Sequence, residues 1–286
     1  MPCIALVHAG IRRSLGALLP VLVSFLALTN ETLAQTAANP TETEISKESE
    51  NPVSRWITLP LRYEADFDSG AYRAVKDTFK LSQGVIPFVL NEDWALITRT
   101  NFPLEALPPK KGGEHWAFGL SNAYTTFFLS PEHGKGFYWG VGPVLYYPSA
   151  TNHALGVNHW GTGPSVAVVW DVPGPWEFAA VANNIWSLGG PPGDSDRTNS
   201  FLLNPIVSYH FEGGWSLGSS PNITANWLSK PSEQWTVPIG GAVSKTFKTG
   251  DHAFKLSLGA YYNAIRPQAS NDTWLAQFTL TIVIPR

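Results

Sequence analysis

Hydrophobic and polar residues alternate with a period of two through most of the chain. Residues 159–190 show the pattern most clearly. One face of each predicted strand there is apolar and begins and ends in tryptophan, first with Trp160 and Trp170, then with Trp176 and Trp186. The opposite face carries small or polar residues, and the sequence VPGP between the strands marks a turn. Because strand side chains point alternately to two faces, this stretch predicts a β-hairpin with one apolar face.

The same alternation continues from Pro52 to the end of the sequence without a helical segment. It predicts strands at 54–68, 78–90, 94–105, 115–129, 136–149, the two strands of 159–190, 199–211, 215–229, 234–247, 253–265 and 272–286. Each is long enough to cross a bilayer at a tilt, which takes ~9–11 residues. Mostly tight turns alternate with mostly longer polar connections. The sequence therefore predicts an all-β fold, an antiparallel up-and-down transmembrane β-barrel of about 12 strands.

The tryptophans support a membrane barrel over a soluble one. The chain has 12 of them, and all fall near the ends of predicted strands. Those near the short-turn end are Trp56, Trp94, Trp139, Trp170, Trp176 and Trp215, and those near the long-loop end are Trp116, Trp160, Trp186, Trp227, Trp235 and Trp274. Indole rings settle at the two headgroup levels of a bilayer, whereas a soluble β-sandwich would gather them at mid-strand in its core.

The first 51 residues differ from the rest of the chain. Arg12 and Arg13 precede a short apolar core, and Thr32-Leu33-Ala34 resembles a small-x-small cleavage site, so residues 1–34 predict a secretory signal peptide. Residues 35–51 are acidic, polar and free of aromatics, which predicts a disordered periplasmic linker. We expect the outer-membrane barrel to span 52–286.

Composition narrows the chemistry further. The only cysteine is Cys3, so the mature chain would have none, which excludes disulfides and cysteine-based metal sites or nucleophiles. A net charge of -3 without a basic stripe argues against nucleic-acid binding. The expected partners are outer-membrane lipid, a small-molecule solute and the barrel-assembly machinery during insertion. No cofactor and no metal are expected.

Some residues break the pattern. Asn122 and Asn184 fall on the outward face by strict alternation, and Trp56 falls on the inward face. Prolines inside strands each remove a ladder donor, and we expect bulges or kinks at them. These prolines are Pro60, Pro87, Pro103, Pro143, Pro164, Pro205 and Pro238.

Charged and amide side chains on the inward face are the candidate site residues. By alternation, the lumen-lining candidates are Arg62, Glu64, Asp66, Lys80, Arg99, Asn101, Asn204, His210, Lys255 and Asn263. They could form a salt-bridged filling of a narrow barrel, since buried charges need partners. They could instead form a polar, charge-selective path for a solute. Around Arg62, Lys80 and Arg99 the sequence allows either a closed ion-pair network or a ladder of separated charges.

Several segments together resemble one bacterial family. They are NEDWALITRTNFP, FYWGVGPVLYYPSAT, HWGTGPSVAVVW, GPWEFAAVANNIWS, FLLNPIVSYHF, QWTVPIGGAVSKTF and the terminal FTLTIVIPR. The resemblance is to the outer-membrane transporter-like family named for the meta-pathway of phenol degradation, whose members are often mislabelled neuromedin U. It covers the predicted barrel and implies passive passage of small, aromatic or hydrophobic solutes. It supplies no catalytic or ligand-binding residue.

Two alternatives to a channel or transporter remain open at this point. Ser208 and His210 lie two apart on one strand face, which could indicate an outer-membrane-embedded lipid-modifying enzyme. A hydrolase also needs an orienting third group and an oxyanion hole, and the sequence indicates neither. The second alternative is a structural barrel without transport. No catalytic residue is predicted.

Overall fold

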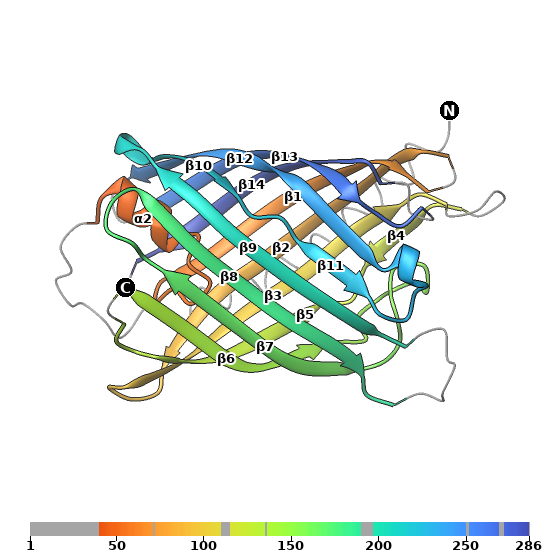
Figure 1. The fold of residues 1–286 in the computed structure, drawn as a ribbon, viewed down its shortest axis with the longest axis horizontal. Helices are drawn as coiled ribbons and strands as arrows, with labels where there is room; N and C mark the ends of the chain where they lie inside the picture. The colour runs from red at the N-terminus through yellow and green to blue at the C-terminus, as the bar shows by residue number, and fades with distance from the viewer. Residues whose placement is uncertain are drawn as a thin grey trace. The chain divides into compact units, whose positions relative to one another are not determined.

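In the computed structural model, residues 40–70, 72–109, 115–134, 136–189, 197–249, 252–268 and 272–285 are described. Their strands form one antiparallel sheet that closes into a barrel (Figure 1), because β13 pairs with β12 as well as with β14. The strands are β1 (Ile57–Ser69), β2 (Ala74–Val89), β3 (Trp94–Leu107), β4 (Ala117–Leu120), β5 (Tyr124–Pro131), β6 (Phe137–Tyr146), β7 (Gly161–Trp170), β8 (Trp176–Ser187), β9 (Asn199–His210), β10 (Trp215–Ser219), β11 (Ile223–Asn226), β12 (Trp235–Thr249), β13 (His252–Ile265) and β14 (Trp274–Ile284). Two short 3-10 turns, η1 (Glu212–Gly214) and η2 (Pro231–Glu233), lie in connections.

Two of the predicted strands are each split in two. β4 and β5 both pair with β3, and β10 and β11 both lie between β9 and β12. The barrel therefore has 12 strands, as the alternation predicts. The break before β5 contains Asn122, whose side-chain nitrogen donates to the carbonyls of Tyr147 (2.7 Å) and Val157 (2.9 Å). The interruption thus accounts for the apparent outward position of Asn122.

Asn184 and Trp56 are accommodated in other ways. Asn184 donates to Asn199 Oδ1 (3.1 Å) and accepts from Trp227 Nε1 (2.8 Å), so its amide is paired with polar groups at the end of the strand. Trp56 precedes β1 and packs against buried Ile45.

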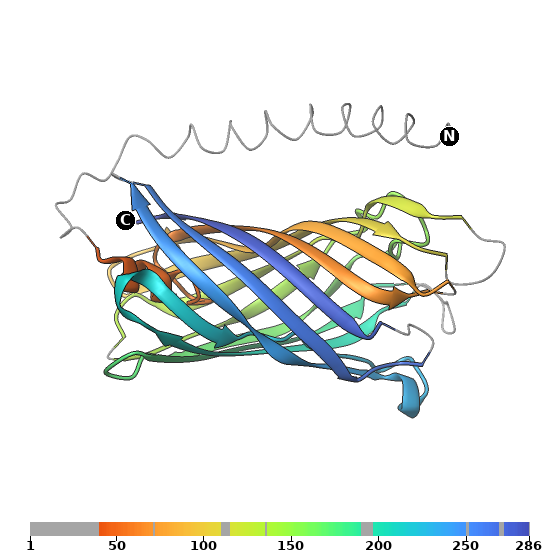
Figure 2. The same cartoon turned by 90° about the horizontal axis from the view of Figure 1, so that it is seen from above.

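The two ends of the barrel differ in the length of their connections. Short turns at 90–93, 171–175 and 211–214 gather at one end, and the longer segment 147–160 lies at the other (Figures 1 and 2). The connection after the first strand is shorter than predicted, because β2 begins at Ala74 rather than near Thr78. Short turns facing the periplasm and longer loops facing outward are typical of outer-membrane barrels.

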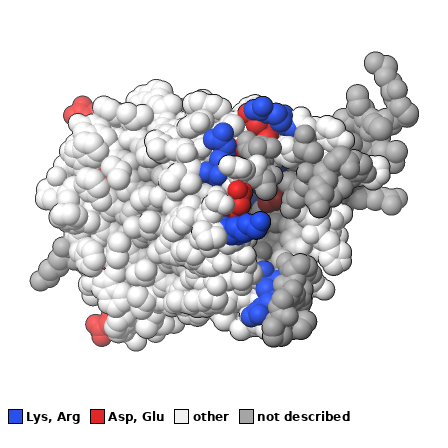
Figure 3. Space-filling model, turned by 45° about the vertical axis from the view of Figure 1, so that its right-hand side comes forward, with Lys and Arg blue, Asp and Glu red and all other residues white. Residues whose placement is uncertain are grey.

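The outer wall of the barrel is apolar. Exposed tryptophans lie near strand ends: Trp116, Trp160, Trp170, Trp176, Trp186, Trp215, Trp227 and Trp274. In the face seen in Figure 3, the wall is nearly free of charge, and charged side chains gather around the long-loop end. A closed sheet satisfies its backbone groups internally, which spanning a bilayer requires, and its apolar exterior suits lipid. The protein is thus an outer-membrane barrel. No helix in the described ranges is both long and apolar enough to cross a membrane.

The strand prolines only partly act as expected. The β1–β2 ladder shifts its register between Thr58 and Leu61, around Pro60, and the β12–β13 ladder shifts at Pro238. The expectation of a bulge is wrong at three other prolines, whose ladders keep their register there: Pro87, Pro143 and Pro164. A proline can be accommodated in this way where its missing N–H faces no ladder acceptor. Opposite Pro103 and Pro205 the neighbouring strand is interrupted instead, between β4 and β5 and between β10 and β11.

The prediction of a disordered linker is wrong for the described part of 35–51. Residues Glu42–Glu48 form helix α2, which begins at the N-cap Thr41. Thr41 and Glu44 form a capping box, in which each side chain accepts a hydrogen bond from the other residue's backbone N–H. The helix lies at the short-turn end against β9, β10, η1 and β12 (Figure 1). The predicted signal peptide 1–34 and residues 35–39 lie outside the described residues.

Candidate functional site

The segment 40–56 fills the short-turn half of the barrel lumen; we call it the plug. Val53 is 2% exposed and packs in a buried cluster of inward-facing residues from six strands. Its partners are Val85, Ile97, Phe128, Ala167, Val169, Ala179, Val181 and Ile206. Ile45 is fully buried against Ala253 and Val283. The lumen at this end is therefore an apolar core around the plug rather than a water-filled path.

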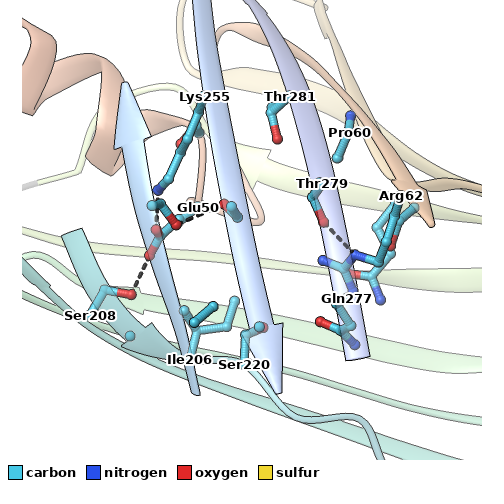
Figure 4. A pocket seen from close by; sticks show the side chains of 18 of the residues that line it. Glu50, Pro60, Arg62, Ile206, Ser208, Ser220, Lys255, Gln277, Thr279 and Thr281 are labelled. Atoms are coloured by element: carbon cyan, nitrogen blue, oxygen red, sulfur yellow. Dashed lines mark hydrogen bonds and ion pairs between the residues drawn. The ribbon is translucent and has the colours of Figure 1, made fainter. Parts of the chain in front are cut away.

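A buried ion pair fastens the plug to the barrel wall. Glu50 accepts hydrogen bonds from Lys255 on β13 and from Ser208 on β9 (Figure 4). The side chains of Lys255 and Glu50 are 3% and 20% exposed. Burial opposes ionisation of Glu50, but the neighbouring Lys255 ammonium outweighs it and holds the pKa of the carboxyl below its usual 4.5. The Glu50 carboxyl is thus ionised at neutral pH.

Next to this pair, a second polar cluster joins the plug to β8 and β9. His210 Nδ1 lies 3.1 Å from Ser46 Oγ in α2, and His210 Nε2 lies 3.2 Å from Glu177 Oε2. Glu50, Glu177 and His210 each offer a possible metal-ligand atom, and these atoms lie within 4.8 Å of one another. Lys255 already neutralises Glu50 there and would repel a cation. We therefore interpret this cluster as an anchor of the plug.

The serine, histidine and glutamate of this cluster also bear on the enzyme alternative. Ser46, Glu177 and His210 are all at most 3% exposed, and none of them lines a cavity among the described residues. Ser208 donates to the Glu50 carboxylate. A hydrolase needs a nucleophile that substrate can reach, and Ser46 is buried; Ser208 does line the cavity, but its hydroxyl is bound to the Glu50 carboxylate. The geometry gives no support to catalysis at these residues.

Ion pairs at the rim hold the two ends of the plug. Lys47 Nζ lies 3.0 Å from Asp171 Oδ1 in the turn between β7 and β8. Arg55 Nε lies 3.4 Å from Glu132 Oε2, and the same guanidinium donates to the Pro131 carbonyl. The plug is thus tied to turns far away in the sequence.

A cavity of about 130 Å³ lies between the plug and the middle of the lumen (Figure 4). Ser49, Glu50 and Asn51 of the plug form one side of it. The rest of its wall is rich in hydroxyl side chains: Thr58, Ser82, Ser208, Ser219, Ser220, Ser244, Ser257, Tyr261, Thr279 and Thr281. Toward the long-loop end a larger chamber of about 1110 Å³ is lined by residues that include Lys76, Glu105, Thr224 and Asp272.

The predicted lumen residues fall into three groups: the cavity wall, the anchor cluster and positions away from the cavity. Arg62, Arg99, Asn204 and Lys255 line the cavity, and His210 belongs to the anchor cluster. The others lie away from the cavity. Asp66 pairs with Lys76 (3.7 Å), Asn263 donates to the Asp272 carbonyl (2.9 Å), and Asn101 is half-buried in β3. The sequence-based set omitted Glu177, although the alternation in β8 already indicates that it faces inward.

The charges on β1 to β3 divide into a network and one separate cation. Glu64 lies 2.6 Å from Lys80 Nζ and 3.6 Å from Arg62 Nη1, and it accepts from Gln277 (3.2 Å). Arg99 is not part of this network. Its Nη2 donates to Gln83 Oε1 (2.6 Å), and no carboxylate of the described residues lies within 4.0 Å of it. The closed network and the separated charge thus occur side by side.

Comparison with known proteins agrees with this architecture. The "COG4313 outer membrane channel" of Pseudomonas putida F1 superposes with a TM-score of 0.59 at 15% sequence identity, covering 88% of this chain and 99% of that one. The NanC porin gives a TM-score of 0.51 at 10% identity, covering 80% of this chain and 100% of that one. At these identities the likeness establishes the fold alone. The comparison with curated proteins finds no matching sequence.

The family comparison covers most of the barrel. The model of the family described as "Putative MetA-pathway of phenol degradation" matches residues 51–264. The match begins inside the plug and ends near the end of β13, so it includes most of the residues that line the cavity but not Glu50 or the cavity residues of β14. The chain belongs to this family of the phenol-degradation meta-pathway.

Proposed function

We propose that the protein is a passive outer-membrane channel for small solutes, closed at its periplasmic end by the plug. The observation that carries this proposal is the hydroxyl-lined cavity inside the barrel, which is bounded on one side by Ser49, Glu50 and Asn51 of the plug, together with the larger chamber toward the long-loop end. A barrel that served only as a structural element would need no polar cavity in its lumen. Polar side chains lining a path are the usual means of solute selection in a pore.

Passage in this proposal requires the plug to leave or to shift. The plug's apolar contacts are few, chiefly Ile45 and Val53, and the rest of its attachment is ionic or hydrogen-bonded. Segments held in this way open locally at a lower free-energy cost than the strands around them. Outer-membrane lipid around the wall, a small solute in the lumen and the barrel-assembly machinery during insertion are the partners that this role implies.

A cysteine lock tests the proposal directly, since the only natural cysteine is Cys3. The lock combines Ser46→Cys in the plug with His210→Cys in β9. In the wild type, Ser46 Oγ and His210 Nδ1 lie 3.1 Å apart. In planar bilayers, the oxidised double variant should be closed. Reduction should restore its conductance to the level of a double-variant sample that was never oxidised. The two single variants under the same oxidant are the matched controls.

Two results would count against the channel. Conductance that is equal in the oxidised and reduced double variant would mean that the plug does not control the path. Absence of conductance from the wild type and from the reduced variant alike would contradict transport. Lipid hydrolysis by the purified wild type, lost in Ser208→Ala, would favour the enzyme alternative instead.

A further inference from the structure

We propose that Arg99 is a receptor for the carboxylate group of small organic acids in the cavity beside the plug. This inference deepens the proposed channel function and rests on it for the route by which such a solute arrives. It assigns a substrate class to the cavity, namely singly charged carboxylates.

Arg99 is a buried cation without a counterion among the described residues. The residue is 8% exposed, lines the cavity from β3, and uses Nη2 to donate to Gln83. Its Nε has no hydrogen-bond partner among the described residues. A guanidinium carries five N–H donors in a planar fork that matches a carboxylate in a two-pronged pair. The unused donors of Arg99 are thus those that a carboxylate would bind.

The other cations of this part of the lumen differ from Arg99. Lys80 pairs with Glu64, Lys76 with Asp66, and Lys255 with Glu50. Burying a charge without a partner is costly, and buried charges in proteins are normally paired. Among these cations of the described residues, Arg99 departs from that rule. A ligand that brings the missing negative charge would account for the departure.

The backbone next to Arg99 is also unusual. Gln83, its hydrogen-bond partner, has a φ of 60° and lies at the register shift between Leu81 and Gly84. A residue other than glycine in the left-handed region costs ~1–3 kcal/mol and tends to occur at functional sites. Here the bulge places the Gln83 amide in the cavity wall, where it orients the Arg99 guanidinium.

The wall around Arg99 suits a small acid more than a multiply charged anion. Hydroxyl groups on β1, β12, β13 and β14 surround the space and can donate to a second carboxylate oxygen. Lys255 pairs with Glu50, and Arg62 and Lys80 share Glu64, so Arg99 is the cavity-lining cation to which a carboxylate would bring a first counterion. The cavity volume of about 130 Å³ limits such a ligand to a small acid.

The test compares benzoate with benzamide, which has the same shape and no charge, using the full-length protein in detergent. Isothermal titration calorimetry should detect benzoate binding and much weaker binding of benzamide. Arg99→Gln keeps a side chain that can bond to Gln83 and should weaken benzoate binding by about tenfold or more, with benzamide unchanged. Arg73→Gln, whose arginine has the Asp68 carboxylate 3.3 Å from its Nε and does not line the cavity, is the matched control and should bind benzoate as the wild type does.

A stability measurement separates ligand binding from a structural role. Arg99→Gln removes an uncompensated buried charge, so its melting temperature should equal or exceed that of the wild type, whereas a structural role predicts a lower one. Equal benzoate affinity in the wild type and Arg99→Gln would overturn the inference. Inorganic phosphate that competes for the site as well as benzoate does would indicate a general anion site. That result would also overturn the carboxylate assignment. Benzoate binding without any conductance would leave the receptor standing and would refute only the channel.

Discussion

Removing the cation that holds the plug should open the channel without unfolding the barrel. Lys255→Met leaves the Glu50 carboxylate beside an apolar side chain, and Glu50 can regain water only if the plug moves out. Breaking one partner of a buried ion pair costs ~3–5 kcal/mol. Because Glu50 keeps 20% of its side-chain surface exposed and also accepts from Ser208, the lower end applies, about 3 kcal/mol. That free energy corresponds to a population of the undocked plug raised by about a hundredfold.

The assay follows the plug and the current in parallel. Hydrogen exchange of the amides of α2 should become faster in Lys255→Met, and single-channel recordings should show a higher open probability. Exchange in the strands should stay as in the wild type, because the barrel remains paired. The control is Lys47→Met, whose pair with Asp171 is 23% and 46% exposed; pairs of this kind contribute ~0–1 kcal/mol.

Substitutions at Glu50 test whether its pair with Lys255 holds the plug. Glu50→Gln alone should also release the plug, since it leaves Lys255 unpaired at 3% exposure. The combination of Glu50→Gln with Lys255→Met removes both charges and should recover most of the docking. If the double variant opens as much as the sum of the single ones, the two side chains are not coupled. The ion pair would then not be what closes the lumen.

Three further results are expected. Val166→Lys on the lipid face should lower barrel stability by ~2–4 kcal/mol, while Gln277→Lys beside the cavity should cost much less; equal losses in refolding titrations would contradict the inward and outward assignment. Lys80→Met should destabilise the barrel by ~3–5 kcal/mol, because its carboxylate partner lies 2.6 Å away and is 9% exposed; an unchanged melting curve would contradict this. The pKa of Glu50 is lowered on docking, so the stabilisation of docking by Glu50 is fully present above pH 4.5 and is lost as the pH falls through the lowered pKa. In that acidic range, amide exchange in α2 should rise in the wild type and much less in Glu50→Gln.

The barrel itself could be predicted because its signal is local. Every strand contributes its own alternation, and lipid on one side and lumen on the other enforce a period of two along its length. The hairpin with Trp160, Trp170, Trp176 and Trp186 was placed to within a few residues. Strand breaks were not predicted, since the interruption at Asn122 depends on carbonyls that come from a loop about 25 and 35 positions away.

The plug could not be predicted from composition, because its structure depends on distant partners. An acidic stretch without aromatics favours disorder when considered alone. Lys255 and His210, which satisfy Glu50 and Ser46, are 205 and 164 positions away in the sequence. One local signal was available. Thr41 and Glu44 have the spacing of a capping box, which marks the first turn of a helix.

The lumen contains both a salt-bridged filling and a polar cavity, because only some of its inward-facing charged residues have a charged partner. Side chains with a partner on another strand or on the plug hold structure: Lys80 with Glu64 in the wall, Lys255 with Glu50 at the plug. Arg99 is buried and charged as well, but its partner is the neutral Gln83, and no carboxylate of the described residues pairs with it. When a fold satisfies its buried charges almost everywhere, the position that breaks the rule is the one to associate with function. On this argument the cavity's selectivity depends on Arg99, and the paired cations around it determine whether the lumen is closed.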